Sequence, residues 1–76
     1  MIMEGIEIST EYIRLDQFLK FSTITESGGF AKEIILNGEV AVNGEIETRR
    51  GRKLYPGDIV EIDGYELIVL EEEQEL

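Results

Sequence analysis

The chain has 76 residues with 7 basic and 17 acidic side chains, which gives a formal net charge of −10, and it contains no cysteine or histidine. Its length leaves room for one hydrophobic core and little room for an enclosed pocket. The missing residue types exclude disulfides, thiolate and imidazole metal sites and most nucleophile–base pairs. We therefore expect a binding protein rather than an enzyme, with no cofactor, no metal and no small-molecule substrate.

The first segment of the chain predicts a strand and gives no sign of export. Met1 to Gly5 has neither a basic leader nor a long apolar run, and no stretch approaches the ~20 apolar residues of a membrane span. We expect a cytoplasmic protein with no membrane partner. Apolar and polar residues alternate around Ile6 and Ile8, which indicates a half-buried strand at the edge of a sheet.

Two helices are predicted next. The first starts at Leu15, because residues at helical spacing form one face that holds Leu15, Phe18, Leu19 and Ser22. Polar residues and two glycines at 23–29 end this helix. The second helix starts at about Phe30 and ends at Asn37-Gly38, which suits a left-handed cap. Its predicted apolar face consists of Phe30, Ala31, Ile34 and Ile35.

The second half of the chain predicts antiparallel strands joined by tight turns. Residues 39–42 read as a strand, and Asn43-Gly44 is a strong signal for a type I′ hairpin that places Ile46 on the return arm. Pro56-Gly57 indicates another turn, and Asp63-Gly64 predicts a hairpin between strands at 59–62 and 65–70. Early helices and late strands favour an α+β fold over a parallel sheet. We expect one domain at 1–70 and an acidic, disordered tail at 71–76.

The charge distribution points to one basic segment. Four of the seven basic residues lie at 49–53, called the basic segment below: Arg49, Arg50, Arg52 and Lys53. Arginine can hold a phosphate with two parallel hydrogen bonds, and Gly51 would let a phosphate approach the backbone. From the residues alone, a solvated loop, an RNA or phosphate site and a contact with an acidic protein all stay open. A phosphate site requires guanidinium groups that are not already held by Glu or Asp.

Other candidate features have a structural and a functional interpretation. Gly28 and Gly29, beside Lys32, suit either a phosphate-binding helix start or a simple reversal, and the pattern of a phosphate loop is incomplete. Phe18 and Phe30 are expected in the core, and Phe21 falls off the apolar stripe. Tyr55 is the better candidate for stacking on a base because it adjoins the basic segment. Three acids near the last hairpin are expected to be solvated rather than to bind a cation: Glu61, Asp63 and Glu66.

The order of motifs resembles the S-four (S4) domain, a small RNA-binding fold named after a ribosomal small-subunit protein. The match covers roughly Ile13 to Ile62. The sequence is similar in particular to the YaaA type, which comprises short, free-standing bacterial S4 proteins. The stretches that carry the resemblance are Arg14-Leu15-Asp16-Gln17-Phe18-Leu19-Lys20, Ser27-Gly28-Gly29-Phe30-Ala31-Lys32, Gly38-Glu39-Val40-Ala41-Val42-Asn43-Gly44-Glu45, Arg49-Arg50-Gly51-Arg52-Lys53-Leu54 and Pro56-Gly57-Asp58-Ile59-Val60.

The resemblance implies a fold, a function and a set of binding residues. The fold has two helices packed on a short, curved antiparallel sheet. The function is non-catalytic binding of structured RNA, chiefly ribosomal RNA, in ribosome assembly or a related process. The competing hypothesis, which rests on the basic segment and not on the resemblance, is an adaptor that docks on an acidic protein. Many S4 domains place more Arg on the second helix than this chain does, so more of the binding falls to the basic segment. The residues that match the family's RNA-binding positions are Arg14, Lys20, Lys32, Arg49, Arg50, Arg52 and Lys53.

Overall fold

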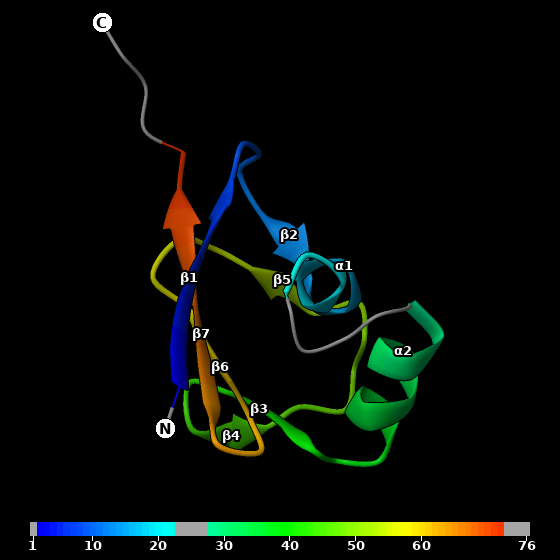
Figure 1. Cartoon of the computed structure of the whole chain (residues 1–76). Coiled ribbons are helices and arrows are strands. Elements are labelled where there is room, and N and C mark those ends of the chain that lie inside the picture. The colour runs from blue at the N-terminus through cyan, green and yellow to red at the C-terminus, as the bar shows by residue number, and fades with distance from the viewer. Residues whose placement is uncertain (1, 23–27, 73–76) are drawn as a thin grey trace, which may run out of the picture.

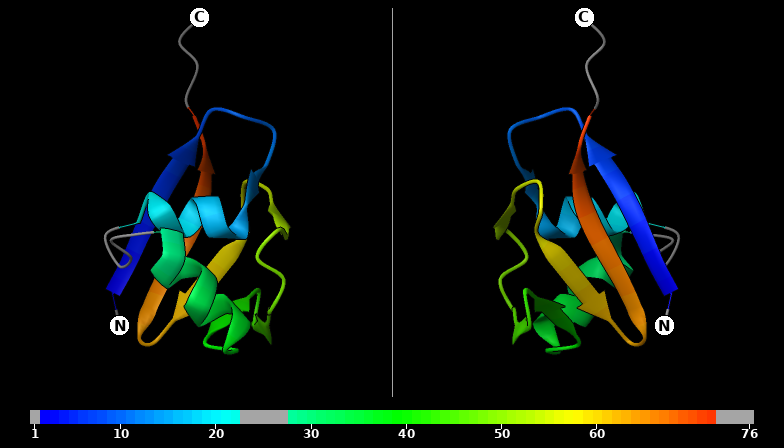
Figure 2. Two further views of the ribbon diagram at one scale, coloured as in Figure 1. Left: turned by 90° about the vertical axis from the view of Figure 1, so that its right-hand side faces the viewer. Right: turned by 90° about the vertical axis from the view of Figure 1, so that its left-hand side faces the viewer.

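Two helices pack against one face of a five-stranded sheet, and a separate two-stranded sheet lies beside the start of the first helix (Figures 1 and 2). The computed structural model describes residues 2–22 and 28–72. The elements within them are β1 (Ile2–Ile8), β2 (Ile13–Arg14), α1 (Leu15–Lys20), α2 (Gly28–Leu36), β3 (Val40–Val42), β4 (Glu45–Ile46), β5 (Lys53–Leu54), β6 (Ile59–Ile62) and β7 (Tyr65–Glu71). The α+β class is as expected.

The main sheet is larger than expected and is mixed. Its strand order is β1-β7-β6-β3-β4, and β1 lies at an edge, as predicted. The expectation of an antiparallel sheet is wrong at that edge, because β1 runs parallel to β7 with Ile2 opposite Tyr65 and Ile8 opposite Glu71. The remaining pairs in this sheet are antiparallel. The first and last strands of the chain are therefore paired with each other.

The turns follow the predicted chemistry. Asn43 and Gly44 both have positive φ, at 52° and 87°, as a type I′ turn requires. Asp63 and Gly64 do the same between β6 and β7, at 35° and 85°. Gly57 has a φ of 100° and follows Pro56 in a turn, as a type II turn requires. These local signals fix the register of the antiparallel strands.

The second helix ends as predicted and begins earlier than predicted. Gly38 has a φ of 76°; its N–H donates to the Ile35 carbonyl at 3.1 Å, and the Glu39 N–H donates to the Ile34 carbonyl at 3.0 Å. These two bonds form a Schellman cap. The helix starts at Gly28 rather than near Phe30, so that Gly28 and Gly29 both belong to its first turn. The preceding residues 23–27 lie outside the described residues.

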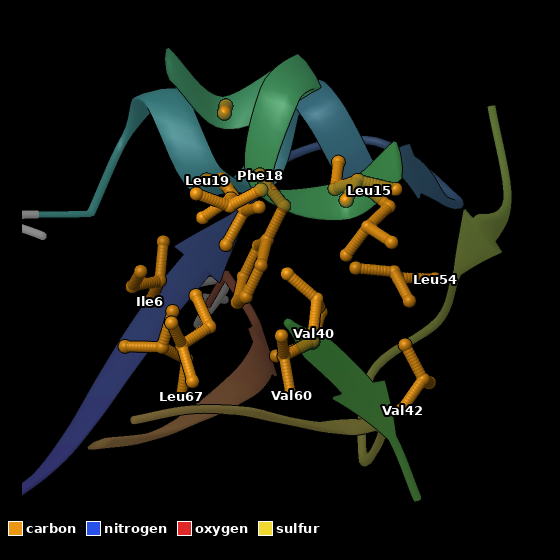
Figure 3. Packing of buried hydrophobic residues seen from close by; sticks show 14 of the residues in the cluster. Ile6, Leu15, Phe18, Leu19, Val40, Val42, Leu54, Val60 and Leu67 are labelled. Carbon is orange, nitrogen blue, oxygen red and sulfur yellow. The ribbon is translucent and has the colours of Figure 1, made fainter. Parts of the chain in front are cut away.

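The core lies between the helices and the sheet (Figure 3). Leu15, Phe18 and Leu19 of α1 are fully buried, which confirms the predicted face. Phe30 was expected in the core but is 48% exposed. The predicted stripe on α2 is wider than the surface that it faces, so Ile35 at one edge is buried and Phe30 at the other is not.

The end of β7 reaches into the stretch expected to be a tail. Glu71 is the last residue of β7, and the Glu72 N–H donates to the Ile8 carbonyl at 3.0 Å. Residues 73–76 of the expected tail lie outside the described residues. Among the helices that the structure describes, none has the length and apolar character needed to cross a bilayer.

Candidate nucleic-acid interface

The backbone of the basic segment is attached to the start of α1. The Leu15 N–H donates to the Arg52 carbonyl at 2.8 Å, and the Asp16 N–H donates to the Arg50 carbonyl at 3.0 Å. Amides in the first turn of a helix have no partner within it, so these bonds satisfy two of them. A third bond, from the Arg52 N–H to the Arg49 carbonyl at 3.2 Å, closes a turn with Arg50 and Gly51 at its corners. The basic segment is thus a turn whose backbone is held by hydrogen bonds to the start of α1.

The two-stranded sheet brings Arg14 to the same place. β2 pairs antiparallel with β5, so that Arg14 lies opposite Lys53 and Ile13 lies opposite Leu54. Leu54 is fully buried and Ile13 packs against the core. Because side chains alternate along a strand, Arg14 and Lys53 point outward, and both are exposed. Figure 1 shows this small sheet beside α1.

A buried carboxylate, which the sequence analysis missed, holds two of the arginines. Glu47 is 6% exposed and accepts hydrogen bonds at 3.0 Å from Nε, Nη2 and the backbone N–H of Arg49 and from Nη1 of Arg52. The requirement that no acid hold these guanidinium groups is therefore not met by Arg49 and Arg52. No such acid contacts Arg50 or Lys53 within the described residues.

The Glu47 contacts shift the protonation of both partners. The hydrogen bonds from the Arg49 side chain lower the pKa of Glu47 from its ordinary 4.5 to about 2, against the opposing effect of burial. The same contact raises the pKa of Arg49. Both groups are fully charged at neutral pH, and Glu47 leaves the four basic side chains of the segment with a net charge of +3.

The arginines that Glu47 holds keep donors for a further ligand. A guanidinium group has five N–H donors, of which Arg49 gives two to Glu47 and Arg52 gives one. The Arg49 side chain is 75% exposed despite its two bonds. Glu47 therefore cancels one positive charge and fixes the orientation of both guanidinium groups, and it leaves three N–H donors of Arg49 and four of Arg52 unused.

The other predicted basic residues are less closely connected. The Arg14 Nε lies 3.5 Å from Asp16 Oδ1, which also accepts the Gln17 N–H at 2.8 Å. Lys20 and Lys32 are both exposed, the first at the end of α1 and the second on α2. Within the described residues, no ion pair or hydrogen bond ties these two lysines to the basic segment.

Aromatic rings adjoin the basic segment. Tyr55 is 45% exposed, and its ring centroid lies 6.0 Å from that of Tyr12, with the planes tilted by 49°. The Lys53 Nζ lies 4.8 Å from the centroid of the Tyr12 ring, which is within range of a cation–π contact. The sequence named Tyr55 as a stacking candidate, which stays a prediction, and did not point to Tyr12, because only the pairing of β2 with β5 brings the two rings together.

The remaining candidates lie at the start of α2 and just past the end of α1. Gly28 and Gly29 do lie in the first turn of α2, where amides lack partners within the helix, and a phosphate site there remains a prediction. Phe21 is 66% exposed, in keeping with its place off the apolar stripe. No group of acids or histidines suited to a metal ion occurs among residues 2–22 and 28–72.

The sequence is similar to a known protein family and to several known proteins. The family model described as "S4 domain" matches residues 6–70. The chain is 55% identical over 60 residues to the "Probable ribosome maturation protein RlbA" of Bacillus subtilis, covering 79% of this chain and 84% of that protein. It is 36% identical over 59 residues to the "Putative RNA-binding protein YbcJ" of Escherichia coli, covering 78% and 84%.

A third relative is much longer than this chain. The "Small ribosomal subunit protein uS4m" of Schizosaccharomyces pombe is 40% identical over 50 residues, which are 66% of this chain and 15% of that protein. The similarity to the two shorter relatives extends over most of each sequence. The chain belongs to the S4 domain family.

Proposed function

We propose that this protein binds structured RNA, with ribosomal RNA as its ligand, and acts as a non-catalytic factor in ribosome assembly in the cytoplasm. One observation carries the proposal: Arg50, Lys53 and Arg14 are held together, exposed, by the bonds of the basic segment to α1 and by the β2–β5 pair. Membership of the S4 family and the printed names of its relatives support it.

Phosphate contacts supply the binding energy in this proposal. Arg50 stands at a turn corner and can form a bidentate pair with a phosphate, while Gly51 beside it has open space where a side chain would be. Arg49 and Arg52 donate from the N–H groups that Glu47 leaves unused. Lys20 and Lys32 extend the contact along the helices, as the resemblance implies. Shape recognition of an RNA helix through its 2′-hydroxyls and backbone adds selectivity.

The net charge of −10 does not prevent this contact. Exposed charges are screened over about 8 Å at physiological ionic strength, so the local field of the basic segment governs a phosphate that touches it. The acids elsewhere repel RNA that approaches other faces. Binding in one orientation is the expected result.

The test compares two variants with the same net charge. Arg50→Ala removes one positive charge from the basic segment, and Met3→Glu adds one negative charge at an exposed position on β1, at the opposite edge of the sheet from β4. We expect Arg50→Ala to weaken the binding of ribosomal RNA in a filter or mobility-shift assay, with Met3→Glu close to wild type. Equal binding by all three proteins would contradict the proposed interface.

Nuclease treatment separates RNA binding from the adaptor alternative. The wild-type protein should co-sediment with ribosomal particles of a lysate and should be released when the RNA is digested. A complex that survives digestion, and that depends on Arg50 in the same way, would instead identify an acidic protein as the partner.

A further inference from the structure

The outward face of the two-stranded sheet carries four exposed side chains together. Arg14 and Lys53 form a cross-strand pair, and Tyr12 and Tyr55 lie one position beyond the Ile13–Leu54 pair that packs on the core. Alternation along the strands places the two tyrosines on the same side as Arg14 and Lys53. The contact of the Lys53 Nζ with the Tyr12 ring, at 4.8 Å, agrees with this arrangement. We call these four residues the tyrosine patch.

The two rings differ in what they can offer a ligand. Lys53 occupies a position over the ring of Tyr12, which is 39% exposed. Tyr55 is 45% exposed and meets Tyr12 at a tilt of 49°, so the two rings do not cover each other as parallel stacked rings would. Tyr55 is therefore the ring that can stack on a further planar group. Tyr12 packs against the Tyr55 ring and contacts the Lys53 ammonium group.

The surroundings of Tyr55 are suited to a nucleotide. The Tyr55 N–H donates to Asp58 Oδ2 at 2.8 Å, which fixes the backbone that carries the ring. The Thr10 hydroxyl donates to the Tyr12 carbonyl at 2.7 Å and holds the facing segment. A half-exposed ring on an anchored backbone, on the same side of the small sheet as Arg14 and Lys53, matches a base with its flanking phosphates, because every base has a π-face and every nucleotide has a charge.

On the basis of the RNA-binding function proposed above, we infer that the tyrosine patch binds an unpaired nucleotide next to an RNA helix. The base stacks on Tyr55, and its phosphates contact Lys53 and Arg14. Bases within a duplex are already stacked on their neighbours, so a helix alone has no base for Tyr55. The patch therefore gives a preference for RNA with a bulge or loop beside the helix that the basic segment contacts.

The experiment uses the whole protein and two RNA probes. One probe is a short RNA duplex, and the other is the same duplex with a single bulged 2-aminopurine nucleotide. We expect wild type to prefer the bulged probe and to change its fluorescence, since stacking alters the emission of 2-aminopurine. Tyr55→Leu should weaken binding of the bulged probe by at least about fivefold, because stacking on a base contributes roughly 1–3 kcal/mol. Binding of the paired duplex should be unchanged.

Two further variants make the result specific to a ring at this position. Tyr55→Phe keeps the ring and should retain the preference for the bulged probe. Phe21→Leu removes an aromatic residue that is 66% exposed just past the end of α1, whereas the basic segment is attached to the start of α1, and should change neither affinity. Thermal unfolding followed by circular dichroism verifies that each variant is folded.

The outcomes separate this inference from the proposed function. If Tyr55→Leu weakens both probes equally, or neither, the stacking site is wrong while RNA binding stands. If wild type binds both probes through Arg50 with no preference, the same conclusion follows. If wild type binds neither these probes nor ribosomal RNA, the proposed function fails and the stacking site fails with it.

Discussion

Glu47 and Arg49 meet through three hydrogen bonds of 3.0 Å, two from the guanidinium group and one from the backbone N–H. A buried carboxylate with this many donors is stabilised in its charged form, and its pKa is about 2. The arrangement holds the basic segment in one shape before any ligand binds. It reduces the conformational entropy that RNA binding would otherwise cost.

The first prediction concerns stability in acid. The folded-state pKa of Glu47 is depressed from 4.5 to about 2, so its contribution to stability is present above pH 4.5 and is lost as the pH falls towards 2. Glu47→Gln should lower stability at neutral pH and should make the decline between these pH values shallower. Urea unfolding at several pH values measures this. Glu45→Gln, at an exposed position on β4, is the matched control. Parallel acid profiles for wild type and Glu47→Gln would contradict the assigned role.

The second prediction concerns salt. A net charge of +3 on the basic segment and Glu47 corresponds to about three neutralised phosphates, so this segment alone should contribute about −2 to −3 to the log–log slope of RNA affinity against salt. Arg50→Ala should make the slope less negative by about 0.7–0.9, because one fewer counterion is released. Titrations at several salt concentrations give the slope. A slope that does not change would place Arg50 outside the interface.

The third prediction tests the junction between the small sheet and the core. Leu54 is fully buried on β5, so Leu54→Ala should lower the free energy of unfolding by about 2–5 kcal/mol. Ile46→Ala removes a residue that is 72% exposed and should cost less than about 0.5 kcal/mol. Denaturant unfolding of both variants provides the comparison. Similar losses in the two would mean that β5 does not contribute to the core.

The fourth prediction concerns Asn43. Its side chain accepts the Ile59 N–H at 3.0 Å and donates to Asp58 Oδ1 at 3.1 Å, which joins the β3–β4 hairpin to the turn before β6. Asn43→Ala loses both bonds and also strains a residue with a φ of 52°, so it should destabilise by about 1–3 kcal/mol. Asn43→Gly loses the same bonds without the strain and should cost less. Equal losses would show that turn strain plays no part.

Local chemistry explains which parts of the fold could be predicted. The turns at Asn43-Gly44 and Asp63-Gly64 and the cap at Gly38 need positive φ, and few residue types supply it, so the sequence alone identified them. The parallel pairing of β1 with β7 was missed because it joins segments far apart in the chain. Phe30 was misplaced because a helical stripe gives the direction of a face but not the extent of the surface that covers it.

The candidate site likewise combines features that are visible in the local sequence with features that only the fold brings together. The cluster of charge at 49–53 is visible in the sequence, and Arg14 was named as a candidate from the resemblance. Glu47 was missed because it is one acid among 17, and only the fold shows that it is buried among arginines. A glutamate two residues before a basic run, after a short strand, is the signal that sequence reading could have used.

The ladder between β1 and β7 also sets an order of events during synthesis. Residues 9–64 separate the two strands, so β1 is synthesised before its partner exists. An edge strand without its partner exposes unpaired backbone groups and apolar side chains. The nascent chain therefore completes its sheet only once Tyr65–Glu71 has emerged, and until then Ile6 and Ile8 lack the strand that pairs with them in the folded protein.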